Sequence, residues 1–282
     1  MSDTLGNKLK LTIFGASHAP QIGVTLSNLP KGMKIDHDFI KFQLQKRRPN
    51  GKESTARIED DEYEIISGVT NNFTNGEDLT IIIPNKKQDS SAYSNIIYRP
   101  GHADYTFDVK YGFRDYRGGG RSSGRETIGR VAAGAIAIKL LEMFGVKFTT
   151  YAKQIGPFEI NMDNFDAENI NNDLLRMPDK ETSIKAQEYL DKVRSEYDSV
   201  GGIIECKIDG VYPGLGDPVF DKLDARLSYA IMSIGAIKGI EFGEGFNVAN
   251  LRGSENNDEF ILKNNKIKNN DEFKAGNNIA TK

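Results

Sequence analysis

A glycine-rich stretch, FRDYRGGGRSSGRETIG at residues 113–129, combines flexible backbone with concentrated positive charge. The three consecutive glycines let the backbone approach a ligand without a Cβ in the way. Free N–H groups at the start of a following helix, together with Arg121 and Arg125, suit phosphate or carboxylate oxygens. The spacing matches neither a dinucleotide-binding loop nor a P-loop. The stretch therefore predicts an anion site; the alternative is a solvated loop whose arginines pair with surface acids.

The chain has three histidines, and two of them are candidates for proton transfer. His18 lies in the small-residue turn FGASHAP, and His102 lies in RPGHADY, just after Arg99. A lone histidine is more often structural, but two histidines in turns, in a chain with just three, are better candidates for general acid–base work. His37, in DHDF, is predicted to be a surface residue at a helix start. Without cysteines at ligand spacing, the sequence predicts no metal site, zinc included.

A second basic patch is Lys46-Arg47-Arg48-Pro49. Its alternative interpretation is the charged C-terminus of a helix, where cations are favourable. Together, the basic patches predict a site for a small molecule with several negative groups. With two histidines available for protons, the expected chemistry is elimination or group transfer on a phosphorylated, carboxylated substrate.

Composition narrows the class of protein. The chain has 282 residues, 38% of them hydrophobic, and a formal net charge of -3. This is enough apolar material for a sizeable core, and the mild acidity argues against an arginine-rich nucleic-acid binder. The single cysteine, Cys206, allows no intrachain disulfide. The sequence shows no signal peptide and no apolar run long enough for a membrane span, so we expect a cytoplasmic protein.

Hydrophobic periodicity predicts strands and long helices in an α+β arrangement. Strands are expected at residues 9–13, 22–26, 63–69, 79–83 and 200–211, and helices at 37–47, 123–144, 182–196 and 218–235. Ser123 and Glu126 have the spacing of a capping box, and Asp217-Pro218 has the form of a helix start. The polar segment with two NNDEF copies, at 256–260 and 269–273, predicts a hairpin or loop.

Long motifs resemble the chorismate synthase family. RPGHADYTFDVKYGFRDYRGGGRSSGRET, followed by RVAAGAIA, is similar to the family's central signature. DSVGGIIECKIDGVYPGLGDPVFDKLDARL and SIGAIKGIEFGEGF are similar to its second half, and FGASHAPQIGV to its first signature. The resemblance implies a β-α-β sandwich of antiparallel sheets with helices in the core. The likeness extends from about residue 5 to about residue 260.

The resemblance also implies an activity. Members are carbon–oxygen lyases that convert 5-enolpyruvylshikimate 3-phosphate to chorismate by 1,4-anti elimination of phosphate. This is the last step of the shikimate pathway and leads to the aromatic amino acids. The family requires reduced FMN, uses NADPH only in bifunctional members, and usually forms homotetramers. No nucleic-acid or membrane partner is implied.

Site residues follow from the same resemblance, position by position. Residues of this chain that match flavin contacts are Arg121, Ser122, Ser123, Gly235 and Ala236. Those that match the substrate pocket are Arg48, Arg99 and Arg125, while Arg47 matches a nicotinamide-cofactor position. His18 matches the histidine that protonates the departing phosphate, and His102 the one near the flavin ring.

The sequence departs from the family in two places. Ala16 and Ala19 replace a glutamate and a glycine of the first signature, so altered local packing is expected. Three later motifs of the family, including an Arg-His-Asp motif, are not found. The expected organisation is a single core over residues 1–260 and a polar tail over 261–282, where the family's C-terminal region is missing. The alternative function is a truncated or degenerate member that binds flavin or phosphate without turnover.

Overall fold

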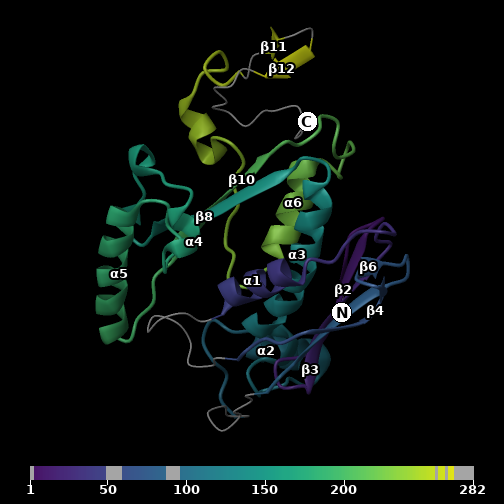
Figure 1. Cartoon of the computed structure of the whole chain (residues 1–282). Helices are drawn as coiled ribbons and strands as arrows, with labels where there is room; N and C mark the ends of the chain where they lie inside the picture. Colours follow the sequence, from purple (N-terminus) through teal and green to yellow (C-terminus); the bar gives the residue numbers. More distant parts are fainter. Residues whose placement is uncertain (1–2, 49–58, 87–95, 258–259, 264–265, 270–282) are drawn as a thin grey trace. The chain divides into compact units, whose positions relative to one another are not determined.

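The computed structural model describes residues 3–48, 59–86, 96–257, 260–263 and 266–269 (Figure 1). The chain forms two compact units, Met1–Gly210 and Val211–Lys282. The single core at residues 1–260 and the polar tail at 261–282 remain predictions, and residues 270–282 lie outside the described part. Within the described residues, no helix is long and apolar enough to cross a membrane.

The first unit is built on a five-stranded antiparallel sheet of order β1-β2-β3-β7-β4. In β3 and β7, alternate residues face one buried side, and Val24 pairs directly with Ile81. The sequence predicted both segments as strands, at residues 22–26 and 79–83, and the observed period of two gives each strand one buried face. The strands are β1 (Thr4–Leu5), β2 (Lys10–Gly15), β3 (Gln21–Ser27), β4 (Glu64–Ser67) and β7 (Leu79–Pro84).

Helices α1 (His37–Arg47) and α3 (Thr127–Glu142) pack against each other and belong to the same core as the sheet (Figure 1). Asp36 caps α1 by accepting a hydrogen bond from the Phe39 amide. Small residues let α3 approach β3 closely: a Cβ added at Gly129 would lie 3.5 Å from the Val24 Cβ. The core residues from the two helices are Ile40, Leu44, Ile128, Ala132, Ala133, Ala135 and Ile136.

The start of α3 differs from the prediction. Ser123 does cap, accepting from the Arg125 amide, but the turn that it caps is a 3-10 turn, Gly124–Glu126. The α-helix begins only at Thr127. Glu126 bonds forward to Arg130 at 3.1 Å. The predicted capping box is therefore wrong for its glutamate, because an ion pair one turn along the helix engages that carboxylate.

A three-stranded antiparallel sheet, β10-β8-β9, lies later in the first unit. Strand β10 confirms the strand predicted at 200–211 and contains Cys206, which is exposed. Helix α5 confirms the one predicted at 182–196, and Asp179 caps it. The elements are β8 (Lys147–Ile155), β9 (Phe158–Glu159), β10 (Gly202–Asp209), α4 (Asn169–Asn172) and α5 (Lys180–Ser195).

Shorter elements complete the first unit. They are β5 (Val69–Thr70), β6 (Phe73–Thr74), α2 (Asp104–Tyr111) and the 3-10 turns Gly120–Ser122 and Met162–Asn164.

The second unit contains α6 (Leu223–Met232), a 3-10 segment (Gly245–Asn250), β11 (Phe260–Lys263) and β12 (Lys266–Asn269). Strands β11 and β12 pair as an antiparallel hairpin, one of the two forms predicted for this segment. The predicted helix start at Asp217-Pro218 is wrong. Asp217 instead forms a β-bridge with Asp221, and Lys222 precedes the helix. Mixed helices and antiparallel sheets give the chain the predicted α+β class.

Candidate functional site

His18 lies in the tight turn between β2 and β3, and the glycine-rich loop holds this turn. The Ser17 amide donates to the Gly120 carbonyl at 3.2 Å, and the Ala19 amide donates to the Ala16 carbonyl at 3.1 Å. Only 9% of His18 is exposed. The sequence predicted His18 in a small-residue turn, and the structure places this turn against the glycine-rich loop, about a hundred residues away.

The three glycines of the loop all have left-handed backbone, with φ of 65° at Gly118, 82° at Gly119 and 55° at Gly120. A Cβ added at Gly118 would lie 2.5 Å from His18 Cε1. One added at Gly119 would lie 3.5 Å from the NH2 nitrogen of Arg99. Only glycine combines this conformation with this close approach. The loop therefore brings His18 and Arg99 into one site.

Arg99 is held by Asp104, the first residue of α2. Its Nε and NH2 atoms donate to the two carboxylate oxygens at 2.9 and 2.8 Å, and its backbone amide donates at 3.0 Å. Hydrogen bonds from the Arg99 side chain hold the pKa of Asp104 well below its usual range. The bidentate pair orients the guanidinium, whose side chain remains 32% exposed.

His102 lies between Arg99 and Asp104 in the sequence, and it is exposed. Its Nδ1 atom is 3.0 Å from the Pro100 carbonyl oxygen. Because a carbonyl only accepts, Nδ1 carries the proton in this contact, and the neutral ring has its lone pair on Nε2. His102 is exposed, so that nitrogen suits proton transfer with a small molecule.

Arg121 joins the loop to strand β2. Its NH2 atom donates to the Asp3 carboxylate at 2.8 Å and to the Ile13 carbonyl at 3.0 Å, and NH1 reaches the Gly15 carbonyl at 3.3 Å. Its side chain keeps 30% exposure. Ser122 donates its hydroxyl to the Gly119 carbonyl at 2.8 Å. These predicted flavin contacts also fix the shape of the loop.

Arg125 is the centre of a buried ion cluster. Its NH1 atom lies 2.5 Å from Asp61 and its NH2 atom 3.2 Å from Glu59, and only 7% of its side chain is exposed. Arg47 bonds the other Asp61 oxygen at 2.8 Å, and Arg48 lies 3.9 Å from the same oxygen. The structure thus brings together three of the predicted arginines, around carboxylates that the sequence did not single out.

Asn85, at the end of β7, is a further residue that sequence reasoning missed. Its side-chain amide donates to the carbonyls of Ala16 and Ala19 at 3.0 and 2.7 Å, and its Oδ1 atom accepts from Arg125 Nε at 3.2 Å. Ala16 and Ala19 are the two positions where this chain departs from the family signature. Their backbone carbonyls, and not their side chains, make these contacts with Asn85. A polar residue directly after a buried strand was the available signal.

Gly235 and Ala236 belong to the second unit, after α6. Ala236 has φ of 71°, an unusual left-handed conformation for a residue with a side chain. Their role as flavin contacts remains a prediction.

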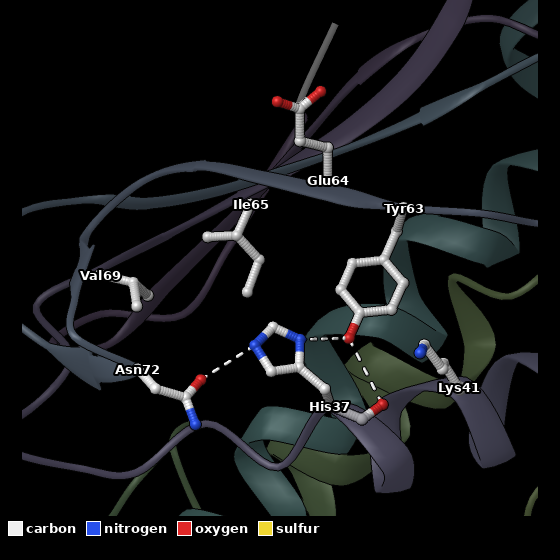
Figure 2. A pocket seen from close by; sticks show the side chains of 7 residues that line it. All are labelled: His37, Lys41, Tyr63, Glu64, Ile65, Val69 and Asn72. Carbon is white, nitrogen blue, oxygen red and sulfur yellow. Dashed lines mark hydrogen bonds between the residues drawn. The ribbon is translucent and has the colours of Figure 1, made fainter.

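A separate pocket of about 490 Å³ is lined by His37, Lys41, Tyr63, Glu64, Ile65, Val69 and Asn72. Figure 2 shows the His37 ring between Tyr63 and Asn72, bonded to them at 2.8 and 2.9 Å. Burial raises the pKa of Tyr63 to about 12, so its hydroxyl stays protonated. His37 is an exposed residue, as predicted, and these bonds tie the start of α1 to the neighbouring strands.

Comparison with known proteins decides the family. A profile of chorismate synthase matches residues 9–277. The chain is 53% identical over 260 residues to a chorismate synthase of Agathobacter rectalis, covering 91% of this chain and 71% of the relative. A chorismate synthase of Lachnoclostridium phytofermentans is 52% identical over 262 residues, covering 92% of this chain and 71% of the relative. The chain belongs to the chorismate synthase family.

The fold agrees with this assignment. A crystal structure of chorismate synthase superposes with a TM-score of 0.80 at 28% identity, covering 97% of this chain and 80% of the other. The resemblance stated from the motifs is therefore confirmed. Membership of the chorismate synthase family supports a lyase activity and a place in aromatic amino acid biosynthesis. Among the described residues, no group of three or more His, Cys, Asp or Glu side chains could hold a metal ion.

Proposed function

We propose that this chorismate synthase family member converts 5-enolpyruvylshikimate 3-phosphate to chorismate and inorganic phosphate. In this 1,4-anti elimination a C–O bond to phosphate and a C–H bond break, a new C=C bond forms, and the proton leaves with a base. The observation that carries the proposal is the loop at 118–120, which joins His18 and Arg99 in one site.

The charge of the site suits the substrate, which carries two carboxylates and a phosphate. Such a molecule needs several cations, since like charges in a poorly solvated pocket repel strongly. Arg48 and Arg99 are part-exposed, with 28% and 32% of their side chains accessible. Asp104 holds the Arg99 guanidinium with two hydrogen bonds, so this cation is oriented before the substrate binds, while Arg48 lies 3.9 Å from Asp61. Arg125 stabilises this arrangement from its buried position, where Glu59, Asp61 and Asn85 bind its guanidinium.

His18 and His102 have different proposed roles in proton transfer. His18, enclosed by the loop, donates a proton to the departing phosphate. His102 is exposed, and its proposed role is to hold a proton on Nε2 near the flavin ring. Positioned general acids and bases typically contribute a factor of about 10² to 10⁴ in rate.

The loop also fits the phosphate-bearing end of FMN. Its glycines leave the backbone bare, and the part-exposed guanidinium of Arg121 and the hydroxyls of Ser122 and Ser123 suit anionic oxygens. We propose that these residues hold reduced FMN, with Gly235 and Ala236 as further contacts. When bound, reduced flavin lends an electron to the substrate and recovers it, so no net redox change occurs.

Three finer features belong to the same proposal. They are a homotetramer, a cytoplasmic location, and binding of NADPH near Arg47 only if the protein is bifunctional. Arg47 lies in the buried cluster with 18% of its side chain exposed.

An anaerobic assay with reduced FMN and 5-enolpyruvylshikimate 3-phosphate tests the function. We expect chorismate and phosphate in equal amounts, and no product with oxidised FMN. A second candidate function, the alternative drawn from the sequence, is flavin or phosphate binding without turnover. Saturable FMN binding by residues 1–282 without chorismate would support that candidate and contradict the first one for this polypeptide.

A further inference from the structure

The side chain of Asn85 lies between the buried arginine cluster and the turn that carries His18. Its Nδ2 group donates to the Ala16 carbonyl at 3.0 Å and to the Ala19 carbonyl at 2.7 Å. Its Oδ1 atom accepts from Arg125 Nε at 3.2 Å. The two carbonyls flank His18 on either side in the sequence, so one amide group fixes both ends of the segment that contains the imidazole.

The chemistry of these contacts selects an amide. Two carbonyl oxygens require donors, while a guanidinium N–H requires an acceptor, and an asparagine side chain supplies both. An aspartate would keep the acceptor and place negative charge against two carbonyl oxygens. A leucine of similar size would leave all three partners without these bonds, at a cost for each buried group.

The arginine cluster gives Asn85 a rigid base. Arg125 is bonded to Asp61 at 2.5 Å and to Glu59 at 3.2 Å, in a setting almost closed to solvent. The Asn85 backbone amide also donates to the Pro20 carbonyl at 2.9 Å. This bond does not involve the side chain, so the end of β7 remains attached to the turn when the side chain is changed.

We propose that Asn85 is a positioning residue that sets His18 against the glycine loop and couples that placement to the arginine cluster. Its catalytic consequence rests on the proposed function, because His18 is the proton donor there. The placement itself can be tested without any turnover.

The test measures how fast diethyl pyrocarbonate modifies each histidine, using peptide mass mapping of the native full chain. His37 and His102 are exposed and serve as references within the same molecule, while His18 is 9% exposed. We expect Asn85→Leu and Asn85→Asp to speed modification of His18 about tenfold, equivalent to about 1.4 kcal/mol of lost protection. The rates at His37 and His102 should stay unchanged.

The control is Asn75→Asp, which makes the same change in a surface turn where the side chain bonds Thr70 and Glu77. It should leave His18 protected. If Asn85→Leu does not fold, Asn85→Asp decides, since it retains the bond to Arg125. Continued protection of His18 in a folded Asn85 variant would overturn the proposal.

A second measurement separates this proposal from the proposed function. If the wild-type chain makes chorismate, Asn85→Asp should lower kcat with little change in KM, because the anion-binding arginines keep their carboxylate partners. A rise in KM alone would count against positioning of His18. If the wild-type chain makes no chorismate, the proposed function fails, and the modification rates still decide the role of Asn85.

Discussion

Gly118 lies directly against the imidazole of His18. A Cβ placed on this glycine would be 2.5 Å from Cε1 and 2.9 Å from Nδ1 of the ring, distances that force a shift. The backbone of Gly118 is also left-handed, with φ of 65°. The glycine-rich loop therefore does more than leave its backbone uncovered: Gly118 packs against the His18 ring and limits its exposure to solvent.

Gly118→Ala should displace His18. The left-handed backbone alone costs about 1–2 kcal/mol, and the clash adds to it. Gly112→Ala is the matched control, since Gly112 has φ of 73° but no described atom within 4 Å of an added Cβ. Both variants should lose stability in urea unfolding, but only Gly118→Ala should move the His18 ring signals in NMR. Unchanged His18 signals in Gly118→Ala would show that the loop, and not the histidine, shifts to accommodate the added methyl group.

His102→Ala should slow turnover by a factor of about 10² to 10⁴ if His102 transfers a proton. The histidine is exposed, so folding should be intact. His37→Ala is the control: it removes the bonds to Tyr63 and Asn72 and should lower stability without slowing the reaction. Measuring kcat and the thermal midpoint of both variants checks this. If His102→Ala and His37→Ala have equal kcat values, His102 does not take part in proton transfer.

Arg121→Ala should weaken FMN binding at least about tenfold, because a charge-assisted contact is worth about 1.5–3 kcal/mol. Arg117→Ala is the control within the same loop, since Arg117 is exposed and pairs with Asp115. Fluorescence titration gives both affinities. Arg121 also bonds Asp3 and strand β2, so thermal unfolding must show that the free variant is folded. Equal affinities in two folded variants would remove Arg121 from the flavin site.

Asp104→Asn should remove an acid-sensitive part of the stability. Because Arg99 lowers the pKa of Asp104 in the folded state, the ionised carboxylate stabilises the fold above its unfolded pKa of about 3.9. This contribution is lost as the pH falls below about 4 toward the lower folded-state pKa. The variant should be about 1.5–3 kcal/mol less stable at pH 7, and the gap should narrow in acid. Urea unfolding from pH 7 to pH 2 tests this; a constant gap would contradict it.

Arg125→Met should be strongly destabilising, by about 3–5 kcal/mol, because it leaves Glu59 and Asp61 buried with less compensating charge. Arg130→Met is the control. Arg130 pairs with Glu126 at 3.1 Å across a part-exposed helix surface, where such pairs contribute about 0.3–0.5 kcal/mol. Chemical denaturation of both variants measures the difference. Similar small losses would mean that the buried cluster relaxes or admits water when the cation is removed.

Local patterns in the sequence determined much of this protein. Short apolar runs located the strands β3 and β7, and local sequence patterns located α1, α5 and most of α3. Such features follow from the repeat of a strand or a helix, so a short stretch of sequence is enough to detect them. The long motifs identified the family, and the run of glycines beside arginines predicted that the loop binds an anion.

Tertiary structure decided which side chains meet. The sequence predicted Arg125 as an anion contact, but its partners Glu59 and Asp61 lie more than sixty residues earlier in the chain, where no local pattern marks them. Glu126 was expected to cap a helix and instead pairs with Arg130. Asn85 had no visible role, because its three side-chain partners come from two distant segments. Ion pairs and buried hydrogen bonds depend on how distant segments approach one another, and only the folded chain fixes those distances.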